Sequence, residues 1–254
     1  MYAIRTAGNS NRRIAFGFIN NRSGDNESGC WEWGGDLSIP RELVPNTNGG
    51  LDVKCPSEIV NYQFPSIDYI FKPKIGNWSI NIKGSSIVVS DTDGFTYGLF
   101  KQIDEKNILL EMDLVLEQKT MSCGIFIRIK EDLTSGYLVR FQPNWQRIIL
   151  EKWPEPMDSY YELNTYYKKI YYGEKIPEAE FREPIVERLL VIVPGIPINV
   201  KMFITEDITE IFVDNKVSLT YRTYSPQEYV LGLFAEGGIC RFDNVQMKVA
   251  NISK

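Results

Sequence analysis

Apolar and polar residues alternate along most of the chain in short runs that end at Gly, Asn, Asp or Pro. The runs are rich in Val, Ile, Tyr and Phe, and a period of two is typical of strands with one buried face. We predict strands at Arg13–Ile19, Trp78–Ile82, Ser86–Ser90, Asn107–Leu116, Gly124–Ile129, Tyr137–Phe141, Arg147–Glu151, Arg188–Val193, Asn199–Thr205, Thr209–Asp214, Val217–Tyr221, Tyr229–Ala235 and Ile239–Val249. No segment shows a convincing helical period. The pattern predicts an all-β fold, a two-sheet antiparallel β-sandwich.

Two stretches interrupt this pattern. The polar loop Asn20–Gly29 is followed by two tryptophans and then by the turn-rich segment Pro45–Gly50, which places a candidate domain boundary near residue 36. We therefore expect a leading segment at 1–35 and a sandwich domain at 36–254. Residues 153–184 hold six tyrosines between prolines and are expected to form a long insertion, and insertions of that length are often functional.

Composition narrows the possible partners. Hydrophobic residues make up 43% and charged residues 24% of the 254 residues, as in ordinary folded, water-soluble proteins. The net charge of −5 argues against nucleic acid, which binds clustered cations. Neutral sugars stay open as ligands, because 13% of the residues are aromatic and aromatic rings stack on sugars as well as filling β cores.

Histidine is absent, which excludes Ser-His-Asp triads, Cys-His dyads and His-ligated zinc. Cys30, Cys55, Cys123 and Cys240 form no metal or redox motif, so we expect reduced, buried thiols and no cofactor. The chain also has no apolar run of about 20 residues and no secretory leader pattern. We therefore expect no membrane partner and, as written, a cytoplasmic location.

One string near the predicted boundary is long and specific. The segment Trp33–Leu43 reads WGGDLSIPREL and resembles the junction W-x-G-x-L-S-x-P-R-E-L of glycoside hydrolase family 32, which contains invertases, levanases and inulinases. Upstream, Arg12–Ile19 is similar to the family's last propeller strand, with Phe18 where Trp is common. Downstream, Thr209–Asn215 and Gly232–Gly238 resemble the last strands of the family's C-terminal sandwich.

The resemblance implies a concanavalin A-like, lectin-like sandwich preceded by a short propeller-derived segment. The family's catalytic Asp and Glu motifs lie in a five-bladed propeller, and none of these motifs occurs in this sequence. A four-stranded blade takes roughly 40 residues, so residues 1–35 supply at most about one blade. The middle of the chain, including the tyrosine-rich insertion, matches no part of the family.

Two sets of residues are candidates for function. The densest aromatic region suits a sugar platform or, alternatively, core packing or an interface, and its candidate sugar contacts are Trp145, Trp153, Tyr160, Tyr161, Tyr166 and Tyr167. The second set is structural: Trp31, Trp33 and Pro40 are expected to fix the junction, although exposed indoles also stack on sugars. Arg41 and Glu42 are read as an ion pair or hydrogen-bonding hub there.

Catalytic carboxyl groups in glycosidases act in pairs. A retaining glycosidase uses two carboxyl groups about 5 Å apart, and the pairs Glu210 with Asp214 and Glu236 with Asp243 are weighed for this role and read as structural. The segment Asp91–Gly94 and the pair Asp104-Glu105 are weak candidates for calcium, because such strings are also ordinary turns.

The leading hypothesis is a non-catalytic C-terminal sandwich module of a family 32-like enzyme that serves stability, assembly or substrate approach. Its partners would be a missing propeller domain or a second copy, and possible ligands are fructan-type oligosaccharides. The alternative is a free-standing, lectin-like carbohydrate-binding module. An enzyme with a new carboxylate pair is the third hypothesis. Strands built for a propeller expose unpaired edges without it, so residues 1–35 are expected to dock on the sandwich, pair with a copy or be poorly ordered.

Overall fold

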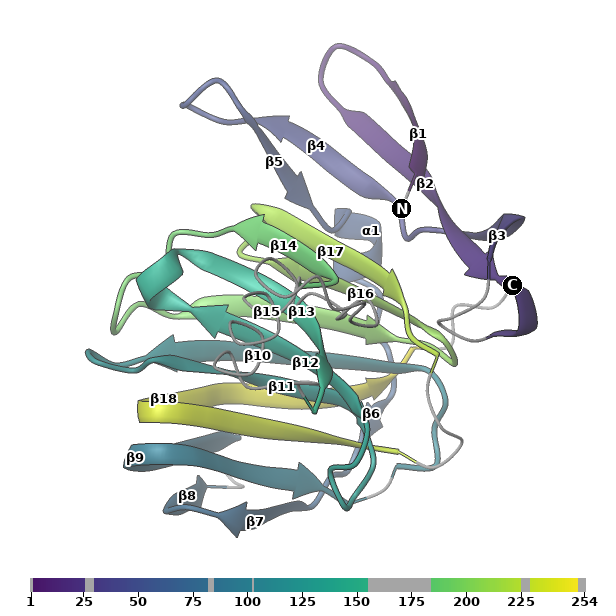
Figure 1. Cartoon of the computed structure of the whole chain (residues 1–254). Coiled ribbons are helices and arrows are strands. Elements are labelled where there is room, and N and C mark those ends of the chain that lie inside the picture. The colour runs from purple at the N-terminus through teal and green to yellow at the C-terminus, as the bar shows by residue number, and fades with distance from the viewer. Residues whose placement is uncertain are drawn as a thin grey trace, which may run out of the picture.

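The computed structural model describes residues 2–25, 30–81, 85–101, 103–154, 184–224 and 229–250. Within these residues the chain forms a small N-terminal sheet and a large β-sandwich (Figure 1). The only α-helix there is the single turn α1, Ser57–Val60, so no helix of the described part is long enough to cross a membrane.

The sandwich begins after α1. Its strands are β6 (Ser66–Ile67), β7 (Phe71–Ile75), β8 (Trp78–Asn81), β9 (Ser86–Phe100), β10 (Ile108–Leu116), β11 (Ser122–Ile129), β12 (Gly136–Gln142), β13 (Arg147–Trp153), β14 (Val186–Leu189), β15 (Ile198–Ile204), β16 (Ile208–Val213), β17 (Val217–Arg222) and β18 (Val230–Val249). All of the described pairings between them are antiparallel.

The two longest strands join the two layers of the sandwich. β11 pairs with the first half of β18 and β10 with its second half, while β9 follows the other edge of both halves. One layer therefore continues through β11 to β14 and the other through β10 to β17. The register shifts between Glu236 and Gly238, and Gly237 between them has φ of 56°. This β-bulge bends β18 from one layer into the other.

Alternation along each strand builds the core between the layers. Ile108, Leu110, Met112 and Leu114 of β10 point into it, and β11 to β13, β15 and β18 contribute further buried apolar side chains. The alternate residue Leu109 packs on the opposite face, in a small cluster with Cys55, Phe203 and Phe212. This outer face of β15 and β16 is thus apolar, and it needs a cover.

The N-terminal sheet provides part of that cover. Its strands are β1 (Tyr2–Gly8), β2 (Arg13–Arg22), β3 (Trp31–Leu37), β4 (Arg41–Pro45) and β5 (Leu51–Lys54). β1 pairs with one edge of β2, and β3 and β4 pair with the other. In Figure 1 this sheet lies above the sandwich, beside β17. Ala15 and Ile19 on β2 are each 3% exposed, so one face of β2 is buried.

The predicted fold class, an all-β two-sheet sandwich behind a leading segment, is confirmed. The segment Val213–Val217 forms a tight hairpin turn between β16 and β17, with Asp214 and Asn215 at positive φ. Other boundaries differ. The turn-like segment Asp91–Gly94 lies inside β9, and the two predicted strands at the C-terminal end are the single strand β18. The predicted strand Arg188–Val193 is shorter and earlier, as β14. The N-terminal sheet extends to Lys54, beyond residue 36.

The cysteines follow the expectation only in part. All four are free thiols, and Cys55, Cys123 and Cys240 are buried. Burial raises the pKa of the Cys55 thiol to about 12, which keeps it protonated and unreactive. Cys30 is exposed, contrary to the expectation of four buried thiols. It directly follows the polar loop, where no sheet covers it.

Gly124 on β11 tests the close packing of the layer. A Cβ at this position would lie 1.8 Å from the Val139 carbonyl oxygen of β12. Gly124→Ala is therefore expected to lower the free energy of unfolding by about 2–4 kcal/mol, measured by urea denaturation. Gly50→Ala is the control, because the nearest atom there is the flexible Asn46 amide at 3.3 Å. Equal stabilities of the two variants would contradict the described pairing of β11 with β12.

Candidate functional site

A buried ion pair holds the junction segment on the outer face of the sandwich. Arg41 Nη2 lies 2.5 Å from Glu210 Oε2 of β16, and the two side chains are 3% and 4% exposed. The guanidinium also donates to Ser218 Oγ at 3.0 Å, to the Ile39 carbonyl at 2.8 Å and to Thr220. The backbone N–H of Ile39 donates to Glu210 Oε1 at 2.6 Å. Both charges are thus fully bonded, as buried charges must be.

A second arginine fastens the segment just before it. Arg222, at the end of β17, donates to Asp36 at 2.5 Å and to Asp207, and it is 6% exposed. Its remaining bonds go to backbone carbonyls of β2, at Asn20 (3.0 Å) and Ile19 (3.3 Å). Arg222 therefore ties β2, β3 and the β15–β16 turn to one point of the sandwich.

A pocket of about 650 Å³ lies beside the two arginines, and its lining includes their carboxylate partners Asp36, Asp207 and Glu210. One wall is the junction segment from Asp36 to Pro40, and a second wall runs from Glu58 of α1 to Phe64. The outer face of β15 and β16 forms the floor, and Asn107 and Ala250 close one side. This volume lies in the range of small-molecule sites in proteins.

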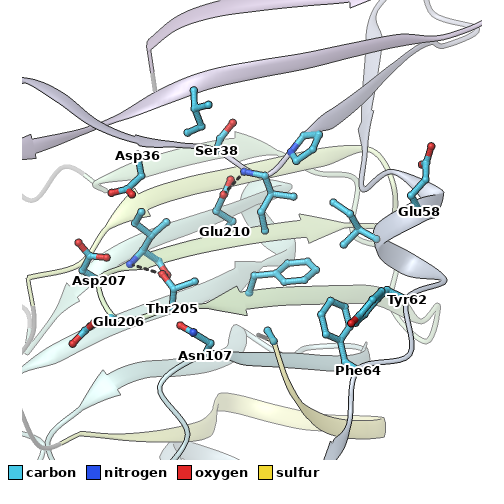
Figure 2. A pocket seen from close by; sticks show the side chains of 17 residues that line it. Asp36, Ser38, Glu58, Tyr62, Phe64, Asn107, Thr205, Glu206, Asp207 and Glu210 are labelled. Atoms are coloured by element: carbon cyan, nitrogen blue, oxygen red, sulfur yellow. Dashed lines mark hydrogen bonds between the residues drawn. The ribbon is translucent and has the colours of Figure 1, made fainter. Parts of the chain in front are cut away.

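The pocket has two chemically different ends (Figure 2). Tyr62 and Phe64 lie together at one end, with ring centroids 4.7 Å apart, and Tyr62 is 60% exposed. Asp36, Asp207 and Glu206 gather at the other end. Such a pocket offers a ligand aromatic surface at one end and hydrogen-bond acceptors at the other.

All of the carboxylates that line the pocket are in ion pairs. Glu210 pairs with Arg41, and both Asp36 and Asp207 pair with Arg222. The other two carboxylates are Glu58, which pairs with Arg12, and Glu206, which pairs with Lys106. Hydrogen bonds from Arg12 lower the pKa of Glu58 to about 2. A general acid needs the opposite shift, toward the operating pH. Five carboxylates thus line the pocket, each paired with a cation, and the shift at Glu58 is opposite to the one that a general acid needs.

Metal binding is not indicated. Among the described residues no three His, Cys, Asp or Glu side chains come together as metal ligands. The weak calcium candidate at 91–94 lies within β9, and the side chains of Asp91 and Asp93 are outside the described part.

The carboxylate pairs weighed from the sequence do not have the spacing of a retaining glycosidase. Glu210 and Asp214 are four residues apart along β16 and its turn, or about 13 Å, and Asp214 accepts a hydrogen bond from the Asn199 amide. Glu236 and Asp243 are seven residues apart on β18, on the order of 20 Å. Glu236 pairs with Arg140 instead.

The aromatic candidates are separated. Trp145 is 68% exposed before β13, with the Arg147 guanidinium 5.2 Å from its ring. Trp153 ends the same strand, about 20 Å away, where it stacks on Phe95 at 5.3 Å. Its indole N–H donates to the Leu133 carbonyl at 3.1 Å. Trp153 thus packs on the outer face of the other layer. The remaining candidates lie outside the described residues, namely Tyr160, Tyr161, Tyr166 and Tyr167.

The junction candidates lie at the pocket and behind it. Pro40 lines the pocket, and Arg41 is the hub described above. Glu42 does not pair with Arg41; it accepts a hydrogen bond from Arg12 at 3.1 Å. Trp31 and Trp33 belong to β3, and their side chains are outside the described part.

Sequence reasoning missed the rest of the pocket. Tyr62 and Phe64 lie outside the strand pattern. Asn107 is the first residue of a predicted strand, and Arg222 directly follows another, so neither was singled out for a pocket. The one available signal is the pair of aromatic residues in the short stretch between Pro56 and Pro65, where a loop would otherwise be polar.

Known structures share the fold of this chain. The carbohydrate-binding module CBM66 from Bacillus subtilis aligns with a TM-score of 0.52 and 16% identity over 73% of this chain and 96% of its own. The exo-inulinase of Aspergillus awamori aligns with a TM-score of 0.58 and 14% identity, over 98% of this chain and 43% of its own. The family 32 β-fructofuranosidase of Bombyx mori aligns with a TM-score of 0.53 and 13% identity, over 98% of this chain and 40% of its own.

These similarities confirm the fold implied by the resemblance to family 32. The described strands follow the C-terminal architecture of those enzymes, and the chain spans less than half of the length of the two enzymes. No protein family model and no curated protein sequence matches the chain.

The Arg41–Glu210 pair makes a testable contribution to stability. Arg41→Met or Glu210→Gln alone is expected to lower the free energy of unfolding by about 3–5 kcal/mol, because each leaves an uncompensated buried charge. The double variant should lose clearly less than the sum. Lys106→Ala is the control, because that pair is 73% exposed on both sides and contributes less than about 1 kcal/mol. Strictly additive losses in urea unfolding would contradict the coupling.

Proposed function

We propose that this chain is a non-catalytic β-sandwich module of the family 32 type, which completes and stabilises a propeller-bearing partner that acts on carbohydrate. The observation that carries the proposal is the two-faced construction of the N-terminal sheet. One face is fixed to the sandwich by Arg222 and the junction, and the other face is exposed.

The exposed face is apolar. Phe16 and Phe18 on β2 are 37% and 39% exposed, whereas Ala15 and Ile19, on either side of the two, are buried. Leu37 of β3 is paired directly with Phe18 and is 62% exposed. Contiguous exposed apolar groups on a sheet mark an interaction surface. We call Phe16, Phe18 and Leu37 the outer patch.

The edge of the same sheet is also available. β1 pairs only with β2 among the described strands, so the outer hydrogen-bonding row of β1 faces away from the sheet. An edge of this kind adds a further strand readily. A propeller blade has both of the surfaces that this sheet requires, a strand edge and an apolar sheet face. The enzymes of the same fold are more than twice as long as the aligned part, which leaves room for such a domain.

A second function is favoured by one observation. CBM66 is named as a carbohydrate-binding module, and the alignment covers 96% of it. The sandwich of this chain is therefore also a candidate for binding sugar without a partner. CBM66 accounts for 73% of this chain, so about a quarter has no counterpart there. The enzyme structures align over 98% of this chain, and for this reason we place association with a propeller first.

Association with a propeller tests the proposal directly. The purified chain is expected to form a one-to-one complex with the isolated propeller domain of an exo-inulinase, observed by size-exclusion chromatography with light scattering. Phe16→Asp combined with Phe18→Asp should weaken the complex by about tenfold or more, because charge is placed in a buried apolar contact.

Leu189→Asp combined with Val191→Asp is the matched control, since both residues are strongly exposed on the sandwich. It should leave the complex intact. The proposal is overturned if no complex forms, or if the chain alone is a dimer that the outer-patch substitutions dissociate. The dimer would assign the outer patch to a second copy.

The absence of catalysis is tested separately. The purified chain is expected to release no fructose from sucrose, inulin or levan, because the carboxylates of the pocket are held in ion pairs and the weighed pairs are too far apart. Release of sugar above background, abolished by Asp207→Asn or another single carboxylate substitution, would show an active site and contradict a non-catalytic module.

A further inference from the structure

We propose that the pocket beneath the junction segment binds a neutral oligosaccharide and rejects anionic sugars. The inference rests on the proposed carbohydrate-related function and adds a ligand site and its charge selectivity. The site borders the outer patch, because Leu37 belongs to the patch and also lines the pocket. Its other walls are the rest of the junction segment, the segment from Glu58 to Phe64, and the floor of β15 and β16.

Charge defines the class of ligand. Five carboxylates and no lysine or arginine line the pocket. The guanidinium of Arg41 is bonded to Glu210, Ser218, Thr220 and the Ile39 carbonyl, and Arg41 is not among the residues that line the pocket. A phosphate or carboxylate entering the pocket would face five carboxylates and would find no lysine or arginine among the lining residues to pair with.

The acidic end provides acceptors in fixed positions. Arg222 holds Asp36 and Asp207, and it is itself buried against β2. A carboxylate has about four lone-pair positions, so each of the two retains capacity for a sugar hydroxyl. Asn107, at the side of the pocket, adds an amide that donates as well as accepts (Figure 2). Groups held by buried bonds lose little entropy when a ligand binds.

The aromatic end provides the apolar surface. Tyr62 is 60% exposed although it lies in ring contact with Phe64, and Phe64 packs edge-on against Phe203 at 6.4 Å. Tyr62 is thus supported from behind and exposed toward the pocket, as a stacking platform for a sugar ring requires. Its phenol also supplies a donor and an acceptor. The volume of about 650 Å³ has room for more than a single small ligand group.

The experiment is calorimetric titration of the full chain with nystose, a neutral inulin-type oligosaccharide, followed by its repetition with variants. Binding to the wild-type chain is expected, and Tyr62→Ala should weaken it by about tenfold. Trp145→Ala is the matched control: its ring is equally exposed, at 68%, but lies outside the pocket, and it should leave the affinity unchanged. Sucrose should compete with nystose, and sucrose 6-phosphate should not.

Three results would overturn the inference. They are no heat of binding with nystose, an affinity that depends on Trp145 and not on Tyr62, and equal competition by sucrose 6-phosphate. Tyr62→Ala should also leave association with the propeller domain unaffected, because Tyr62 lies in the segment after α1 and is not part of the outer patch. A complex that forms while nystose does not bind would remove the inference and retain the proposed function.

Discussion

The fold depends on the burial of two arginines between the N-terminal sheet and the sandwich. Arg41 is bonded to Glu210 and Arg222 to Asp36 and Asp207, and each also binds backbone carbonyls of the segment that it fastens. Removing such charges from water costs several kcal/mol unless their hydrogen bonds are all made. Since the bonds are made only when the junction lies on β16 and β17, the arginines fix one position for it. The pocket and the orientation of the outer patch both follow from that position.

β2 shows how one short sequence serves two surfaces. Its alternation puts Ala15 and Ile19 against the sandwich and Phe16 and Phe18 outside. The inner side of the strand lies close to Arg222, which donates to the Ile19 and Asn20 carbonyls. Large apolar residues on the outer side are exposed to water in the chain alone, where they lower its solubility. They become favourable once a partner covers them, and this is the physical basis for the proposed assembly role.

Much of the fold was predictable from the sequence, and little of the pocket was. Period-two runs located most sandwich strands, because burial on one face imposes alternation. The segment Asp91–Gly94 was predicted to lie outside a strand, and it lies within β9 at the point where the register with β18 shifts between Asp91 and Phe95, so the turn-like string marks an irregularity inside a long strand. The motif at Trp33–Leu43 identified the junction, but the partner of Arg41 proved to be Glu210, which is 169 positions away. Tyr62 and Asn107 likewise line one pocket only because of long-range packing, which no local sequence pattern contains.

The central claim is that a propeller domain covers the outer patch of the N-terminal sheet and pairs with the exposed edge of β1. Hydrogen–deuterium exchange of the chain, alone and mixed with a propeller domain, tests it most directly. The account predicts fast exchange of the outward-facing β1 amides in the chain alone and strong protection of these amides in the mixture, with β10 and β18 unchanged. Protection of the outward-facing β1 amides already in the chain alone, or new protection confined to the sandwich, would contradict it.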